Sequence, residues 1–263
     1  MTRPLALVTG ASAGIGQSFA ELLAPDHDLI IVARRRERLE ALAQRLSAAH
    51  GADVQVLVAD LGTPAGVDAV AARAAAAPLE LIINNAGFGG YRPFVQLDPA
   101  IADQLLSVHV RAAVQISRAA LPGMIQRARG GIVNVASLLS LSASVPPGNF
   151  MPQRVVYAAS KAFLLAFTQL LAHELGSTKV RVQVCLPGIV KTEFHEVQGF
   201  DTSKMPPRMS PDDVARASLA ALARGEVVCV PALDDPAALQ KIDEAQRAVL
   251  AVATQAVLAT RYR

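Results

Sequence analysis

The sequence predicts an α/β fold in which a mostly parallel sheet is covered by helices on both faces, as in a doubly wound domain. Apolar runs of strand length alternate along the chain with longer alanine-rich stretches of helical spacing. The composition is 52% hydrophobic and only 4% aromatic, so the core is aliphatic. Such a core suits buried parallel strands packed under alanine-rich helices.

The strand candidates follow one another with helix-length segments between them. They are Leu5–Val8, Leu29–Val32, Val54–Val58, Leu79–Ile83, Ile132–Val135, Val180–Leu186 and Val227–Val230. Parallel neighbours require long right-handed crossovers, which the intervening helices provide. Residues 142–156 and 191–211 are interpreted as loops that follow strands, on the side of the sheet where ligands bind. We therefore expect one domain over residues 1–263.

The charge of the chain argues against nucleic-acid binding. The formal net charge is only +3, and the basic residues are scattered apart from a cluster at Arg34, Arg35, Arg36 and Arg38. Cys185 and Cys229 lie in apolar runs and imply no disulfide framework. We find no signal peptide and no run of the roughly 18 apolar residues that span a bilayer. A reducing cytoplasm is the expected location.

A glycine-rich turn follows the first strand, in the sequence TGASAGIG. Gly10 permits a tight turn, Gly14 lets the backbone approach a pyrophosphate, and Gly16 lets helix and strand pack closely. Amide groups at the start of the following helix then face the anion. Its place in the first βαβ unit favours a dinucleotide-binding loop over a purely structural turn.

The end of the second strand favours NADP(H) over NAD(H). The strand ends IVARRR, with Ala33 where an acid would bind the adenosine ribose and Arg34 next to it. Arg34 and Arg35 are suited to a 2'-phosphate, although at least one of the arginines is expected to be a solvated helix start. Asp60 ends the third strand and either meets the adenine amino group or caps the helix near Pro64.

Tyr157 and Lys161 are four residues apart, which places them on one face of a helix. A tyrosine with a pKa near 10 is a poor acid or base at neutral pH, whereas a nearby ammonium favours the phenolate. We therefore expect Lys161 to lower the pKa of Tyr157.

Five motifs together resemble the short-chain dehydrogenase/reductase family. They are TGASAGIG, NNAG at residues 84–87, IVNVAS ending at Ser137, YAASK at residues 157–161, and LPGIVKT at residues 186–192. Their order and spacing match over residues 4–192. The resemblance implies a Rossmann-type seven-stranded parallel sheet of order 3-2-1-4-5-6-7, and a homodimer or homotetramer.

The resemblance also implies the roles of the site residues. Tyr157 is the expected general acid in carbonyl reduction and the base in alcohol oxidation, Ser137 binds the same oxygen, and Lys161 holds the nicotinamide ribose. The expected cofactor-binding residues are Gly10, Ser12, Gly14, Ile15, Gly16, Arg34, Arg35, Asp60, Leu61, Asn85, Ala86, Gly87, Tyr157, Lys161, Pro187, Gly188, Val190 and Thr192.

His109 departs from the family pattern. It stands where an asparagine usually supports a water-mediated proton relay to the lysine. A histidine can bind water and can also change charge near neutral pH, so His109 is a candidate fourth catalytic residue. The alternative is a tolerated packing substitute. The remaining histidines, His27, His50, His173 and His195, show no metal-site spacing; His195 is expected near substrate, and His50 and His173 on helix surfaces.

These observations predict an NADP(H)-dependent oxidoreductase that interconverts a carbonyl and an alcohol. The residues expected around the nicotinamide suggest an apolar or bulky carbonyl substrate: Phe88, Leu138, Leu139, Phe150, Met151, Phe194 and Met205. The alternative function is a catalytically weak NADP(H)-binding sensor or scaffold. A methyltransferase is disfavoured, because no acid follows the second strand.

Two segments within the domain have more specific expectations. Residues 189–210 are the expected substrate loop. Residues 236–260 have apolar side chains at nearly helical spacing and are expected to form a terminal helix, which docks on its own domain, contributes to a subunit interface or lies on a membrane surface. No stable membrane insertion is expected.

Overall fold

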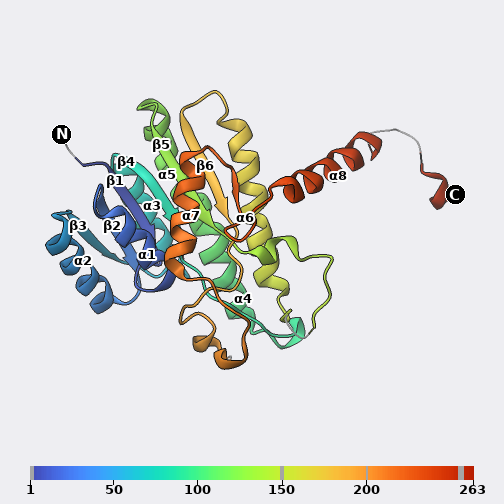
Figure 1. Cartoon of the computed structure of the whole chain (residues 1–263), viewed down its shortest axis with the longest axis horizontal. Coiled ribbons are helices and arrows are strands. Elements are labelled where there is room, and N and C mark those ends of the chain that lie inside the picture. Colours follow the sequence, from blue (N-terminus) through green and yellow to red (C-terminus); the bar gives the residue numbers. More distant parts are fainter. Residues whose placement is uncertain (1–2, 149–150, 200, 254–257) are drawn as a thin grey trace. The chain divides into compact units, whose positions relative to one another are not determined.

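The computed structural model describes residues 3–148, 151–199, 201–253 and 258–263. Its sheet has seven parallel strands in the order β3-β2-β1-β4-β5-β6-β7, which confirms the predicted topology (Figure 1). The strands are β1 Leu5–Thr9, β2 Asp28–Ala33, β3 Val54–Val58, β4 Leu79–Asn84, β5 Gly130–Val135, β6 Val180–Cys185 and β7 Val228–Cys229. The last strand is shorter than predicted, because only its two residues pair with β6.

Helices cover both faces of the sheet. One face packs against α1 Gly14–Leu23, α2 Arg36–His50 and α7 Pro211–Ala223. The other packs mainly against α3 Pro64–Ala76, α5 Ala112–Gln126 and the end of α6 Val155–Glu174, while α4 Pro99–Leu106 contacts α6. Both cores are aliphatic, with Phe19 the largest fully buried side chain. The two covered faces leave the carboxyl ends of the strands as the edge that can hold a ligand.

The ends of β1 and β4 are joined by one buried hydroxyl. Thr9 Oγ1 donates to the carbonyl of Ile83 at 3.2 Å and accepts from the backbone N–H groups of Asn85 and Ala86 at 2.9 and 3.0 Å. The Asn85 side chain returns a hydrogen bond to the Thr9 carbonyl at 3.0 Å. These bonds fix the turn after β4 against the turn after β1.

A second buried polar chain ties the sheet to two helices. Asn84 of β4 donates to Asn134 Oδ1 of β5 at 2.9 Å and to Ser117 of α5 at 3.1 Å. Asn134 in turn donates to Thr168 of α6 at 2.9 Å. Because buried polar groups are costly without partners, these bonds fix α5 and α6 in register with the strands.

Among the described residues, α6 alone has the length and apolar composition of a bilayer-spanning helix. Its buried side chains include Tyr157, Ser160, Lys161 and Thr168, and it packs against β6 and the 3-10 turn Leu138–Leu141. A mixed polar and apolar buried stripe of this kind is typical of a core helix within a globular fold.

The chain divides into two compact units, residues 1–231 and residues 232–263. The second contains α8 Ala237–Ala253, which confirms a helix in most of the expected tail segment. Residues 254–257, including Ala256, lie outside the described residues. What α8 packs against stays a prediction.

We expect Thr9→Val to lower the free energy of unfolding by about 2–4 kcal/mol, because it removes the shared acceptor of the part-buried amides of Asn85 and Ala86. Thr9→Ser keeps the hydroxyl and removes only a methyl group, so its loss should stay near 1 kcal/mol. Urea denaturation of the two variants beside the wild type measures the difference. Equal losses for the two variants would show that the hydroxyl does not fix this junction.

Candidate functional site

The carboxyl ends of the strands surround a cavity of about 1180 Å³. The turns after β1, β2 and β3 line one end, and the segments after β4, β5 and β6 line the other. Of the residues expected to bind the cofactor, all line this cavity except Gly16, which lies behind the wall. Ser137, Tyr157, Lys161 and His109 line it as well.

The glycine-rich loop fits the close approach of a dinucleotide. Gly10 and Gly14 have φ of +69° and +56°, which side-chain-bearing residues rarely adopt. A Cβ on Gly10 would lie 2.7 Å from the Asn85 amide nitrogen, and one on Gly14 would lie 2.9 Å from Thr192 Cγ2. A Cβ on Gly16 would overlap the Gly10 carbonyl. The backbone is therefore exposed to the cavity and has no room for side chains.

The arginines after β2 separate into different surroundings. Arg34 and Arg35 line the cavity, whereas Arg36 begins α2, is exposed and pairs with Glu40. Arg35 donates through Nε and Nη2 to Ser12 Oγ of the glycine-rich loop, at 3.0 and 2.9 Å. Two of the three consecutive arginines, Arg34 and Arg35, thus line the cavity, and Arg36 is the solvated helix start.

The alternatives for Asp60 are separated by the structure. Thr63, and not Asp60, is the N-cap of α3, accepting from the Gly66 amide at 3.1 Å. Asp60 instead accepts from the Gly62 amide at 2.9 Å and lines the cavity. Its carboxylate thus closes the turn after β3, and contact with adenine stays a prediction.

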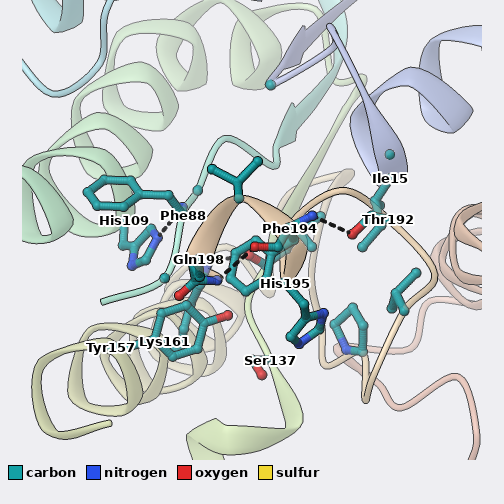
Figure 2. Close-up of a pocket in the computed structure, with 18 of the residues that line it drawn as sticks. Ile15, Phe88, His109, Ser137, Tyr157, Lys161, Thr192, Phe194, His195 and Gln198 are labelled. Atoms are coloured by element: carbon teal, nitrogen blue, oxygen red, sulfur yellow. Dashed lines mark hydrogen bonds between the residues drawn. The ribbon is translucent and has the colours of Figure 1, made fainter. Parts of the chain in front are cut away.

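Ser137, Tyr157 and Lys161 come together from β5 and α6. Figure 2 shows their side chains around the same part of the pocket. Ser137 follows β5, and its Oγ accepts from the Leu139 amide at 3.2 Å. Lys161 Nζ donates to the carbonyl of Val135 at 2.9 Å and lies 5.9 Å from the centre of the Tyr157 ring. The lysine is 4% exposed, so its charge is almost removed from water.

The pKa of Tyr157 departs from the sequence-based expectation. Burial raises it, and hydrogen bonds with Ser137 and Tyr91 offset only part of that rise. Burial also lowers the pKa of Lys161 to about 7. The expected lowering of the Tyr157 pKa by Lys161 is therefore wrong for the protein without cofactor. Desolvation disfavours both charged forms, and the ammonium is directed at a backbone carbonyl.

His109 lies in a π-helical turn, Ser107–Arg111, between α4 and α5. Its Nε2 accepts from the Phe88 amide at 3.3 Å (Figure 2), and its Nδ1 is 2.9 Å from Ser160 Oγ. The Nε2 bond requires that Nδ1 carry the proton, so the ring donates to Ser160, which donates to the Tyr157 carbonyl at 2.8 Å. Burial and the neighbouring Lys161 hold the pKa of His109 well below its ordinary value.

Tyr91 is a site residue that sequence analysis missed. Its ring meets the Tyr157 ring edge-on at 5.1 Å, and the two side chains are hydrogen-bonded. Burial, followed by the influence of Tyr157, raises the pKa of Tyr91, so its hydroxyl keeps its proton and is the donor. Tyr91 lies four residues after the NNAG motif, and this position is the sequence signal that could have identified it as a site residue.

The remaining part of the cavity is largely apolar. Among the residues predicted there, Phe88, Leu138, Leu139, Met151, Phe194 and Met205 line it, and Phe150 lies outside the described residues. His195 lines it too, while His50 and His173 are exposed on helices as expected. No three His, Cys, Asp or Glu side chains in the described part of the chain group together as a metal site would.

A buried arginine holds one loop of this apolar end. Arg154 is 7% exposed and precedes α6. Its guanidinium donates to Ser142 Oγ and to the carbonyls of Ser142, Val145 and Pro152, at 2.7–3.1 Å. All three of these residues line the cavity. The bonds therefore fix the loop that precedes the Tyr157 helix.

Comparison with solved structures shows similarity over the whole chain. A short-chain dehydrogenase from Sphingobium yanoikuyae in complex with NADPH is 35% identical, with a TM-score of 0.92 over 99% of this chain and all of that one. The bulky-bulky ketone specific alcohol dehydrogenase from Comamonas testosteroni is 30% identical, with a TM-score of 0.89 over 100% and 99% of the chains. A Burkholderia phymatum protein that binds NAD is only 23% identical, with a TM-score of 0.76, and shows the fold alone.

Sequence comparisons agree with the structural ones. The NADP-dependent 3-hydroxy acid dehydrogenase of Salmonella typhi is 32% identical over 81% of this chain and 86% of that protein. The family model described as short chain dehydrogenase matches residues 4–201, which contain the glycine-rich loop, Ser137, Tyr157 and Lys161. The chain is therefore a member of the short-chain dehydrogenase family, and an oxidoreductase acting between alcohol and carbonyl groups.

Proposed function

We propose that this protein reduces apolar, bulky ketones or aldehydes with NADPH and catalyses the reverse oxidation with NADP⁺. The convergence of Ser137, Tyr157 and Lys161 on one cavity with the glycine-rich loop is the observation that carries the proposal. The apolar side chains that line the cavity support a bulky carbonyl compound, as in the similar ketone-specific dehydrogenase, over the hydroxy acid of the Salmonella relative.

The proton chemistry follows from the tyrosine hydroxyl. When bound, the nicotinamide supplies the hydride in reduction and accepts it in oxidation. Tyr157 donates its proton to the carbonyl oxygen, and the Ser137 hydroxyl binds the same oxygen. Tyr91 donates to Tyr157, which stabilises the phenolate left after that transfer. Burial lowers the pKa of Lys161 to about 7, which brings this buried amine within range of proton exchange at neutral pH.

The residues at the adenosine end support NADP(H). Arg35, oriented by Ser12, and Arg34 present positive charge after β2, where Ala33 offers no carboxylate to a ribose. A 2'-phosphate gains charge-assisted hydrogen bonds there, and the second ribose hydroxyl of NAD(H) gains none from this strand. A cytoplasmic location and assembly into homo-oligomers stay predictions.

Tyr157→Phe should abolish carbonyl-dependent NADPH oxidation, with a loss of at least about 10²-fold in kcat and retained cofactor affinity, because the proton donor is gone. Absorbance assays over bulky aryl ketones, small aldehydes and 3-oxo acids measure this effect. Tyr91→Phe keeps the donor and removes only its hydrogen bond, so its loss should stay within about tenfold. Turnover that survives Tyr157→Phe would contradict the proposed role.

For His109 we propose a positioning role in place of a proton-carrying one, because both ring nitrogens are engaged with Phe88 and Ser160. His109→Asn should retain kcat within about tenfold and leave the pH profile unchanged, since the histidine pKa lies well below 6.5 and its ring stays neutral. His109→Leu should lower both kcat and stability. If a pH-dependent change in kcat is present in the wild type and is lost in His109→Asn, proton transfer would be assigned to His109.

Arg35→Ala should weaken NADPH binding by about 10- to 100-fold and leave NADH binding unchanged, because only the 2'-phosphate uses its charge-assisted bonds. Arg36→Ala, which removes an exposed arginine paired with Glu40, is the matched control and should alter neither affinity. Titration calorimetry with NADPH and NADH measures the ratio of their dissociation constants. An unchanged ratio in Arg35→Ala would indicate no 2'-phosphate site at this strand.

A further inference from the structure

A carboxylate from the substrate loop lies on the arginines of the cofactor end. Glu193, in the loop after β6, is 2.5 Å from Arg35 Nη1 and 3.0 Å from Arg38 Nη1. Arg35 precedes α2 and Arg38 lies in its first turn, so these ion pairs join segments 158 and 155 residues apart. The exposed fractions of the side chains are 33% for Glu193, 43% for Arg35 and 51% for Arg38, so water and salt reach these pairs.

Arg35 is therefore shared between two partners. Its Nε and Nη2 face Ser12, while its Nη1 faces Glu193. Ser12, Arg34, Arg35 and Glu193 all line the same cavity. A 2'-phosphate arriving at Arg35 would use the same donors and meet the charge of Glu193. The 2'-phosphate and the Glu193 carboxylate would repel each other if both stayed on the Arg35 guanidinium, so binding of one favours departure of the other.

The neighbours of Glu193 connect this ion pair to the substrate end. Thr192 packs against the loop at Gly14, where a Cβ would lie 2.9 Å from its methyl group. Phe194 lies with its ring centre 6.1 Å from that of Tyr157 and 6.3 Å from that of Tyr91. A shift of Glu193 away from Arg35 thus moves a segment that also forms the wall beside Tyr157.

We propose that Glu193 is a counter-anion that the 2'-phosphate of NADP(H) displaces, so that cofactor identity is transmitted to the substrate loop. NAD(H), which has no such phosphate, leaves Glu193 on Arg35 and Arg38. The displacement opposes phosphate binding, so Glu193 reduces the preference for NADP(H) that the arginines create. This inference rests on the proposed phosphate site at Arg35.

The test uses Glu193→Gln in the full chain, with NADP⁺ and NAD⁺ as probes in titration calorimetry at low ionic strength. We expect NADP⁺ to bind about three- to tenfold tighter to the variant, NAD⁺ affinity to change less than about twofold, and the difference to shrink in salt. Glu196→Gln removes an exposed charge three residues along the same loop and is the matched control. It should leave both affinities unchanged.

Hydrogen–deuterium exchange supplies a readout of the loop itself. In the wild type, NADP⁺ should increase exchange over residues 192–199 relative to NAD⁺, because the ion pairs are released. In Glu193→Gln the free protein should already exchange faster there, with little further change on adding NADP⁺.

The outcomes separate this inference from the cofactor proposal. Weaker or equal NADP⁺ binding by Glu193→Gln would overturn displacement; weaker binding would mean that Glu193 orients Arg35 for the phosphate. If Arg35→Ala lowers NADP⁺ affinity while Glu193→Gln does not raise it, only the inference fails. If Arg35→Ala changes neither cofactor affinity, the phosphate site itself is wrong.

Discussion

The tight contact between the turns after β1 and β4 is the constraint on which the site depends. The Asn85 amide fills the space beside Gly10 and Gly16, leaving no room for a Cβ on either glycine. Thr9 holds that amide and the neighbouring backbone with buried hydrogen bonds. The glycine-rich loop proposed to bind the phosphates and the turn that borders the proposed catalytic residues are thus parts of one junction.

Local backbone rules made much of the fold and part of the site predictable. The glycine-rich loop could be predicted from the sequence, because positive φ and close backbone contacts restrict positions 10 and 14 to glycine. The strand order came with the family resemblance, and buried parallel strands have continuous apolar runs that mark their places. The α6 spacing brought Tyr157 and Lys161 to one face, as a helical repeat requires.

What the sequence left open depends on contacts between distant segments. The partners of His109, Phe88 and Ser160, lie 21 and 51 residues away, and no spacing rule connects them. The ion pairs of Glu193 likewise join segments 158 and 155 residues apart. The predicted direction of the Tyr157 pKa shift was wrong. The sequence shows a neighbouring ammonium, but it does not show how deeply the tyrosine is buried, and burial dominates the shift. The sequence also left two roles open for Asp60, and only the turn geometry showed that Thr63 caps α3 instead.

The buried ammonium of Lys161 also bears on how the chain is sorted during synthesis. Helix α6 is long and apolar enough to resemble a membrane span when it first emerges, before β6, against which it packs, has been synthesised. Lys161 is the seventh of the 20 residues of α6, and a lysine inside such an apolar segment opposes partition into hydrocarbon, by up to about 2.5–3.5 kcal/mol at the centre of a span. The residue placed beside Tyr157 therefore also disfavours misinsertion of its own helix. Replacing Lys161 with an apolar residue would therefore lower the cost of inserting α6 into a membrane, and it would also remove the lysine amine from the pocket.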